Sequence, residues 1–230
     1  MRILVSVRNS DEAAIAASAG VDFIDLKEPA AGALGGLPGE QIRAIVASLA
    51  ERGAGIRISA TIGDLPVEAE AEIVARVRVV AACGVNLVKV GLPGQGGRAA
   101  LRVAERLAGL GVPLVPVLIA DRGLAPDFVA AIAGLPFAAV MLDTQVKTGG
   151  SLLDLLPEPV LQGFLASARG AGRSAGLAGA LRQADLPALR RLDPDFAGFR
   201  SAVCDGPRAS ALSADCLERL LVELRPLEVG

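Results

Sequence analysis

The lysines are the residues whose type and scarcity most suggest chemistry. The chain of 230 residues contains no histidine, and its lysines are Lys27, Lys89 and Lys147. Without histidine, Ser-His-Asp and Cys-His catalysis are excluded, as is any metal site that depends on imidazole. Acid–base work then falls to lysine, aspartate and glutamate. A partly desolvated lysine loses its proton readily and attacks carbonyl carbons. The lysines therefore predict Schiff-base chemistry, in which the iminium acts as an electron sink.

Two aspartates are expected to share the site with these lysines. Asp25 stands two residues before Lys27 in an apolar segment, so both side chains point to the same face of a strand. Asp143 ends another apolar segment, and Lys147 follows it by four residues. A buried lysine needs a carboxylate partner or a lowered pKa, because unpaired buried charge is expensive. Each residue alone is more simply explained as a solvated side chain or a helix cap, but their combination favours a catalytic site.

Apolar segments of strand length alternate with amphipathic, helix-like segments along the whole chain. The expected strands are 2–7, 22–27, 56–61, 86–90, 113–119, 138–143, 174–178 and 196–200. The expected helices begin near residues 10, 38, 66, 98, 126, 157, 184 and 213. This alternation predicts a parallel sheet. Eight such units in a chain of this length predict an α/β fold of the (β/α)8 TIM barrel type, with residues 1–230 forming a single domain. The alternative is a doubly wound open sheet, but that fold usually has GxGxxG after its first strand, where this chain has Arg8-Asn9-Ser10.

The barrel prediction brings the candidate residues to one mouth. Catalytic groups of such barrels lie at the carboxyl ends of the strands. Lys27, Asp143 and Arg200 are expected to end the second, sixth and eighth strands. Lys89 stands next to last in the fourth. Because the layers inside a barrel are formed by alternate strands, we expect these residues to meet at one level.

The loops after the seventh and eighth strands are the expected phosphate site. Barrels often bind phosphate at these loops. Gly179 allows the backbone to approach a ligand closely, Arg200 can bind phosphate bidentately, and Ser201 follows it. Glycine also simply ends strands, so Gly179 alone does not distinguish a phosphate site from an ordinary turn.

The composition excludes several other classes of protein. A net charge of −2 offers no basic surface for nucleic acid. The sequence shows neither a run of 18 apolar residues nor a basic leader, so we expect no membrane association and no export. Cys83, Cys204 and Cys216 lack metal-site spacing and fit a reducing, cytoplasmic environment. The lysine chemistry requires no metal or organic cofactor. The sequence leaves open whether the chain forms a homo-oligomer.

Several motifs follow one another along nearly the whole chain. They are ILVSV, DFIDLKEP with GALG, SATIGD, VKVGL, MLDT with Lys147, LAGAL and FRSAVC. In this order they resemble the (5-formylfuran-3-yl)methyl phosphate synthase family, also called 4-(hydroxymethyl)-2-furancarboxaldehyde phosphate synthase. One departure is segment 119–123, which in archaeal members is longer and contains aromatic residues. A lid formed there is therefore not expected to be shared.

The resemblance implies a carbon–oxygen lyase that condenses two molecules of glyceraldehyde 3-phosphate to a phosphorylated furan aldehyde, with loss of phosphate and water. It implies that Lys27 forms the Schiff base and that Asp25, Lys89, Asp143 and Lys147 support it. The furan leads to methanofuran in methanogens and methylofuran in methylotrophs. The high alanine and arginine content suggests a bacterium with a GC-rich genome and so favours methylofuran.

Two other functions remain open from the sequence. One is another lysine-dependent aldolase, or an isomerase of sugar phosphates, on the same barrel. The other is a regulator that binds sugar phosphates without converting them. Product analysis separates the enzymes from one another, and loss of Lys27 separates catalysis from binding.

Overall fold

Eight parallel strands close into a barrel in chain order, with β8 beside β1. This computed structural model describes residues 1–53, 55–147 and 149–224. The single-domain prediction also covers residues 54, 148 and 225–230, which lie outside this description. The strands are β1 (Arg2–Val7), β2 (Phe23–Leu26), β3 (Arg57–Thr61), β4 (Leu87–Pro93), β5 (Leu114–Ile119), β6 (Ala139–Asp143), β7 (Ser174–Leu177) and β8 (Phe196–Phe199). The predicted fold class, a (β/α)8 barrel, is confirmed.

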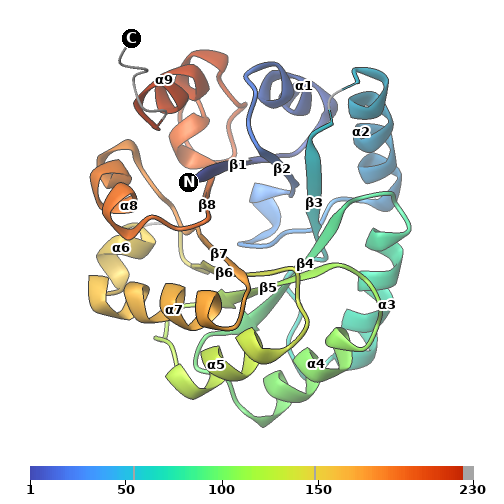
Figure 1. The fold of residues 1–230 in the computed structure, drawn as a ribbon. Coiled ribbons are helices and arrows are strands. Elements are labelled where there is room, and N and C mark those ends of the chain that lie inside the picture. The colour runs from blue at the N-terminus through green and yellow to red at the C-terminus, as the bar shows by residue number, and fades with distance from the viewer. Residues whose placement is uncertain (54, 148, 225–230) are drawn as a thin grey trace.

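Helices surround the barrel and connect each strand to the next (Figure 1). The α-helices are α1 (Ser10–Ser18), α2 (Gly39–Glu51), α3 (Glu70–Ala81), α4 (Arg98–Ala108), α5 (Pro126–Gly134), α6 (Leu152–Leu155), α7 (Glu158–Gly170), α8 (Leu186–Leu192) and α9 (Ala214–Leu224). Short 3-10 turns are η1 (Pro29–Ala31), η2 (Gln183–Asp185) and η3 (Ser201–Val203). Among the described residues, no helix is both long and apolar enough to cross a bilayer.

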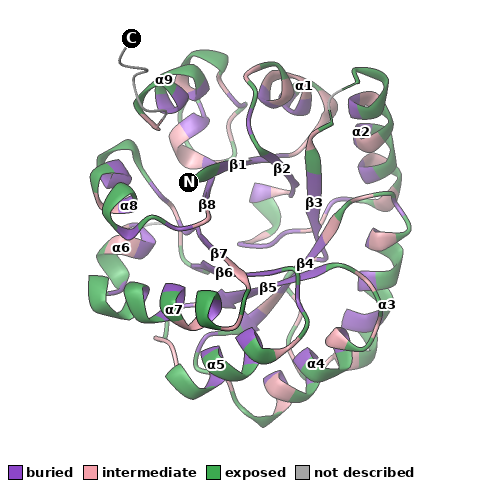
Figure 2. Ribbon diagram, in the orientation of Figure 1, coloured by how far each residue is buried: buried purple, intermediate pink, exposed green. Residues whose placement is uncertain are grey.

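Two apolar cores hold the strands from opposite sides. The larger core lies between strands and helices and includes Ile24, Leu26 and Val90. The smaller fills the barrel and includes Phe23, Val117 and Met141. Because the strands are covered on both faces, they are apolar almost throughout, as parallel strands generally are. Figure 2 shows the buried strands inside a ring of helices whose outer faces are exposed.

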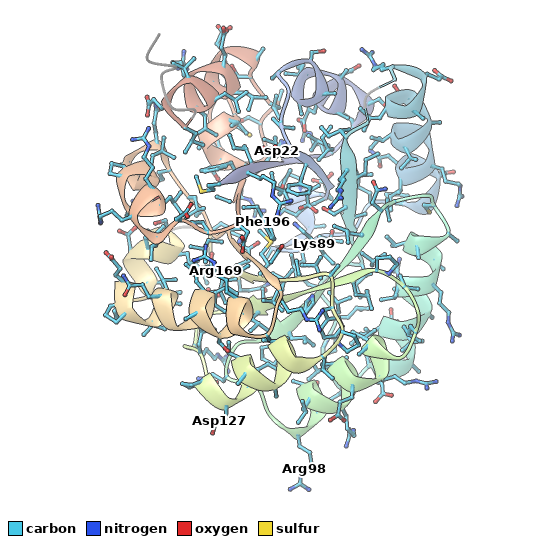
Figure 3. All side chains as sticks on the ribbon, viewed as in Figure 1. Asp22, Lys89, Arg98, Asp127, Arg169 and Phe196 are labelled. Carbon is cyan, nitrogen blue, oxygen red and sulfur yellow. The ribbon has the colours of Figure 1, made fainter. Side chains whose placement is uncertain are left out.

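Small residues leave room for large side chains inside the barrel. A Cβ atom on Gly176 would lie 2.1 Å from the ring of Phe196. That ring makes an edge-to-face contact with Phe23, with ring centroids 5.8 Å apart. Figure 3 shows Phe196 and Lys89 within the ring of strands, whereas Arg98 and Asp127 point outward from it. Phe23 and Phe196 therefore help to fill the barrel's interior.

Local sequence signals explain where several helices begin. The side chain of Asn9 accepts a hydrogen bond from the backbone N–H of Glu12 and caps α1, as the sequence predicts. Proline precedes α2 and begins α5, positions that its fixed φ favours. The expected helix near Pro66 begins only at Glu70, because residues 66–69 form a turn. Helix α6 was not predicted, although Ser151 and Asp154 form a capping box at its start.

Strand β4 is longer than predicted and places Lys89 deeper in the barrel. The predicted strand ends at Val90, but β4 continues to Pro93 in register with β5. Lys89 is therefore the third of seven strand residues rather than next to last. Strand β2 is shorter and ends at Leu26, although the backbone N–H of Lys27 still donates to the Val7 carbonyl. The two lysines consequently stand at different depths in the same barrel.

Candidate active site

All the residues selected from the sequence line one cavity at the carboxyl ends of the strands. They are Asp25, Lys27, Lys89, Asp143, Lys147, Gly179, Arg200 and Ser201. The cavity floor is apolar and includes Leu4, Val117 and Met141. Lys27 and Lys89 are only 6% and 3% exposed. Their side chains thus meet in a largely desolvated space, where electrostatic interactions are stronger than in water.

Asp25 is the centre of the first polar group. Its carboxylate oxygen Oδ1 lies 3.1 Å from the Nζ of Lys89. The hydroxyl of Ser59 donates to Oδ1 over 2.6 Å, and that of Ser6 donates to Oδ2 over 3.2 Å. Strand register explains this group, because Ser6 on β1 and Ser59 on β3 both lie opposite Asp25 on β2. The carboxylate is therefore held by neighbours on both sides.

Asp143 is the centre of the second polar group. Its Oδ1 accepts hydrogen bonds from the Nζ of Lys147 and, over 2.7 Å, from the backbone N–H of Thr144. Its Oδ2 lies 3.8 Å from the Nζ of Lys27. One carboxylate thus joins two lysines. Lys147 is the more tightly bound, and Lys27 makes only the longer contact.

Burial and charge act against each other in these groups. Burial lowers the pKa of Lys89 below its usual 10.5, although the charge of Asp25 opposes this. Burial also lowers the pKa of Lys147, against the opposing effect of Asp143. Burial alone would raise the pKa of Asp143, but Lys147 and Lys27 outweigh it and keep this pKa below 3.8. The site therefore combines an ionised carboxylate with lysines that release protons more easily than exposed ones.

The turn after β7 forms another part of the cavity wall. Gly179 has φ +109°, and Ala180 adopts the left-handed conformation with φ +48°. A Cβ on Gly179 would lie 2.9 Å from Cγ2 of Thr144, so glycine is required here by packing as well as by φ. Within the described chain, the backbone N–H groups of residues 179–181 make no hydrogen bond. Such unpaired amides at a cavity wall suit an anion.

Arg200 reaches the cavity, but its guanidinium is occupied by the protein. It forms a buried bidentate pair with Glu12, with N–O distances of 2.5 and 3.2 Å. Its remaining N–H groups donate to the backbone carbonyls of Ser6, Arg208 and Ser210. All five guanidinium N–H groups are therefore used. Arg200 lies at the cavity, where the sequence places it. The predicted bidentate phosphate contact, however, would require Arg200 to break these bonds.

Sequence reasoning missed Ser6, Ser59 and Arg208. The two serines occupy inward-facing strand positions, but only the register between strands shows that they flank Asp25. Arg208 lines the cavity from the loop after β8, where no periodic pattern identifies it. The cavity lining contains Arg208 and three lysines but only two aspartates. This mouth is therefore electropositive, although the net charge of the chain is −2. Such a field attracts anionic ligands.

The described residues include no cluster of three or more aspartate, glutamate or cysteine side chains that would hold a metal ion. The polar groups of the cavity are instead amines, carboxylates, hydroxyls and backbone amides. These groups can attack carbonyls, transfer protons and bind anions. Fold and site together define a (β/α)8-barrel protein with a lysine-rich site at its C-terminal mouth.

The comparisons with known proteins agree with this class. The family model described as 4-HFC-P synthase matches residues 3–221, and the chain belongs to this family. The (5-formylfuran-3-yl)methyl phosphate synthase of Methanopyrus kandleri is 37% identical over 235 residues, which cover 96% of this chain and 98% of that protein. A protein of Methylorubrum extorquens, provisionally given the same name, is 41% identical over 203 residues, 88% of this chain and 82% of its own. The names of these relatives indicate a synthase.

Solved structures of low sequence identity share the fold. Phosphoribosyl anthranilate isomerase from Thermus thermophilus has a TM-score of 0.64 and 19% identity, covering 98% of this chain and 100% of that one. A 3-hexulose-6-phosphate synthase has a TM-score of 0.57 and 20% identity, covering 96% and 99%. At this sequence identity, the structural similarity supports only the barrel fold.

Proposed function

We propose that this protein is a (5-formylfuran-3-yl)methyl phosphate synthase that condenses two molecules of glyceraldehyde 3-phosphate through a Schiff base on Lys27. The relatives that carry this name support the activity. The observation that carries the mechanism is the difference among the three lysines. Lys89 lies 3.1 Å from Asp25 and Lys147 is hydrogen-bonded to Asp143, whereas Lys27 has its nearest carboxylate at 3.8 Å. Lys27 is the least restrained amine and the best placed to react.

The reaction begins when the neutral amine of Lys27 adds to the carbonyl carbon of one triose phosphate. Loss of water from the adduct gives an iminium ion, and a neighbouring base removes the proton from the adjacent carbon. The electron pair left behind forms an enamine, which either attacks the carbonyl of the second triose or expels phosphate from the next carbon. Overall, two C3 phosphates become one C6 furan phosphate when one inorganic phosphate and two water molecules leave, and Lys27 is regenerated.

The two aspartate–lysine groups supply the proton transfers. Asp25 and Lys89 form one connected acid–base pair, and Asp143 and Lys147 form another, whose carboxylate also lies 3.8 Å from the Nζ of Lys27. Burial lowers the pKa of Lys147, which suits an amine that accepts and returns a proton. The chemistry resides in the protein's own side chains and uses no metal or organic cofactor. The electropositive mouth favours phosphorylated substrates.

The test is to incubate the purified protein with glyceraldehyde 3-phosphate alone. We expect an ultraviolet-absorbing furan aldehyde and inorganic phosphate in equal amounts, and no product from the Lys27→Met variant. The matched control is Arg98→Gln, which removes a cation that points outward from the barrel (Figure 3) and does not line the cavity. A sugar phosphate formed without phosphate release would show an aldolase or isomerase instead. Binding without turnover would show a regulator, and either result would overturn the proposal.

The wider setting follows from the same proposal. As a carbon–oxygen lyase using a phosphorylated metabolite, the enzyme would act in the cytoplasm and supply the furan of methylofuran or methanofuran. Deletion of the gene in its own cell should abolish the furan cofactor, and the cofactor should return when the gene is reintroduced. A strain that keeps the cofactor after deletion would separate this protein from that pathway.

A further inference from the structure

The loop after β8 is held against the barrel by a buried ion pair. Glu12 on α1 accepts both a bidentate contact from Arg200 and a hydrogen bond from the backbone N–H of Leu212. Arg200 in turn donates to the carbonyls of Arg208 and Ser210. The two ends of the loop also meet in an antiparallel bridge between Cys204 and Leu212. The backbone of residue 208 is therefore fixed beside the cavity.

The side chain of Arg208 has very different surroundings from that of Arg200. Its guanidinium lines the cavity and makes one long hydrogen bond, 3.4 Å from Nη2 to the carbonyl of Gly32 in the loop after β2. In the part of the chain that the structure describes, no carboxylate lies within ion-pair distance of it. Burial lowers the pKa of Arg208, with Asp143 and Asp64 acting against this from farther away. The group nevertheless stays cationic, as arginine does in proteins.

A half-buried cation without a carboxylate partner is costly unless another anion completes the site. The cavity wall near Arg208 also carries the unpaired backbone amides of residues 179–181. Both features call for the same kind of ligand, a compact anion with several oxygen acceptors. A guanidinium matches two oxygens of a phosphate group at once. A carboxylate would satisfy the guanidinium but leave fewer acceptors for the amides.

We propose that Arg208, and not Arg200, is the guanidinium that binds a phosphate group of the substrate. This inference rests on the proposed function for the identity of the substrate, a triose phosphate. Arg200 and Glu12 then act as positioning residues, because they hold the Arg208 carbonyl and the loop that carries it. Arg208 contributes to affinity and orientation, while the lysines contribute the chemistry.

The test compares Arg208→Gln, Arg208→Lys and the matched control Arg98→Gln. For Arg208→Gln we expect KM for glyceraldehyde 3-phosphate to rise at least about tenfold, because charge-assisted hydrogen bonds are lost. We expect kcat to change less than KM. Lysine keeps the charge without the bidentate geometry, so Arg208→Lys should recover part of the loss. Arg98→Gln should behave as the wild type. An unchanged KM in the glutamine variant would overturn the proposal.

A second measurement separates this inference from the proposed reaction. Glycerol 3-phosphate has no carbonyl and cannot form an imine, so calorimetric titration with it reports phosphate recognition alone. We expect Arg208→Gln to weaken its binding at least about tenfold, and glycerol itself to show no binding to any variant. If Arg208→Gln weakens this binding while the wild type makes no furan, the proposed function fails and the role of Arg208 stands. If Arg208→Gln binds it as tightly as the wild type, the role of Arg208 fails whatever the reaction is.

Discussion

At the scale of single residues, the site depends on how each charge is held. Asp25 has partners on both sides, since two serine hydroxyls and Lys89 contact its carboxylate. Lys147 is fixed by Asp143, but Lys27 is held only loosely. Because the groups are buried, a lost partner is not replaced fully by water. Small changes beside the reacting groups should therefore alter the rate more than they alter the fold.

The serines beside Asp25 allow a graded test of this view. Ser59→Ala removes the 2.6 Å hydrogen bond to Asp25, and Ser6→Ala removes the longer bond of 3.2 Å. We expect kcat to fall about tenfold in Ser59→Ala, less in Ser6→Ala, with KM nearly unchanged in both, because a lost hydrogen bond to a charged group costs roughly 1.5–3 kcal/mol. Steady-state kinetics at fixed pH measure this. Equal rates in the wild type and both variants would show that the serines do not position Asp25.

At the scale of elements, the barrel brings together groups that are far apart in the chain. The pair between Glu12 and Arg200 joins α1 to the end of β8, and both side chains are buried. Thr61 at the end of β3 donates to the Gly35 carbonyl and so holds the loop after β2. These contacts fix the loops that frame the mouth. They stabilise the fold and shape the site at the same time.

The ion pair predicts a defined dependence of stability on pH. Burial alone would raise the pKa of Glu12, but hydrogen bonds and charge from Arg200 and the backbone keep it below 4.5. The ionised carboxylate therefore contributes its full stabilisation above the unfolded-state pKa, about 4.3, and this is lost as the pH falls through the lower folded-state pKa. Glu12→Gln should lower the free energy of unfolding at pH 7 by about 3 kcal/mol.

Urea denaturation of the wild type and Glu12→Gln from pH 7 to pH 3 measures this dependence. The difference between the two proteins should shrink at the acidic end. Asp11→Asn is the matched control on the same helix, because Asp11 is exposed. A difference that stays constant with pH would mean that the ionisation of Glu12 does not stabilise the loop.

Strand and helix positions could be predicted from the sequence because the spacing of apolar residues and the helix-capping residues are local signals. Strand β1 is confirmed at both ends, and β6 at its carboxyl end, Asp143. The depth of Lys89 could not be predicted, because β4 is extended by pairing with β5, which is not local. Contacts between residues far apart in the sequence could not be predicted either. The Glu12–Arg200 pair spans 188 positions in sequence, and it is what occupies the arginine selected for phosphate.

At the scale of the whole molecule, the distribution of cations is the clearest feature. Every lysine of the chain lies in one cavity, whereas most of the arginines lie elsewhere. Arginine stays charged at all relevant pH values, and lysine can lose its proton when buried. The molecule therefore confines its lysines to the mouth of the barrel, and its other surfaces carry arginines, which do not titrate.

This distribution predicts the response to amine-reactive reagents. Because the lysine side chains are buried in the folded protein, acetylation of the native chain should be at least about tenfold slower at all three than in urea. Peptide mass spectrometry at several times gives the rates. Added glycerol 3-phosphate should slow the native reaction further. Labelling of Lys27, Lys89 and Lys147 at the unfolded-state rate would contradict the buried site.

In the proposed mechanism, Lys27 forms a covalent imine with the substrate. Borohydride reduction during turnover of glyceraldehyde 3-phosphate converts such an imine to a stable secondary amine, which peptide mass spectrometry can locate. We predict a substrate-derived mass on the peptide that contains Lys27, and no such mass in Lys27→Met. Continued furan production with no adduct, or an adduct confined to Lys89 or Lys147, would contradict the account.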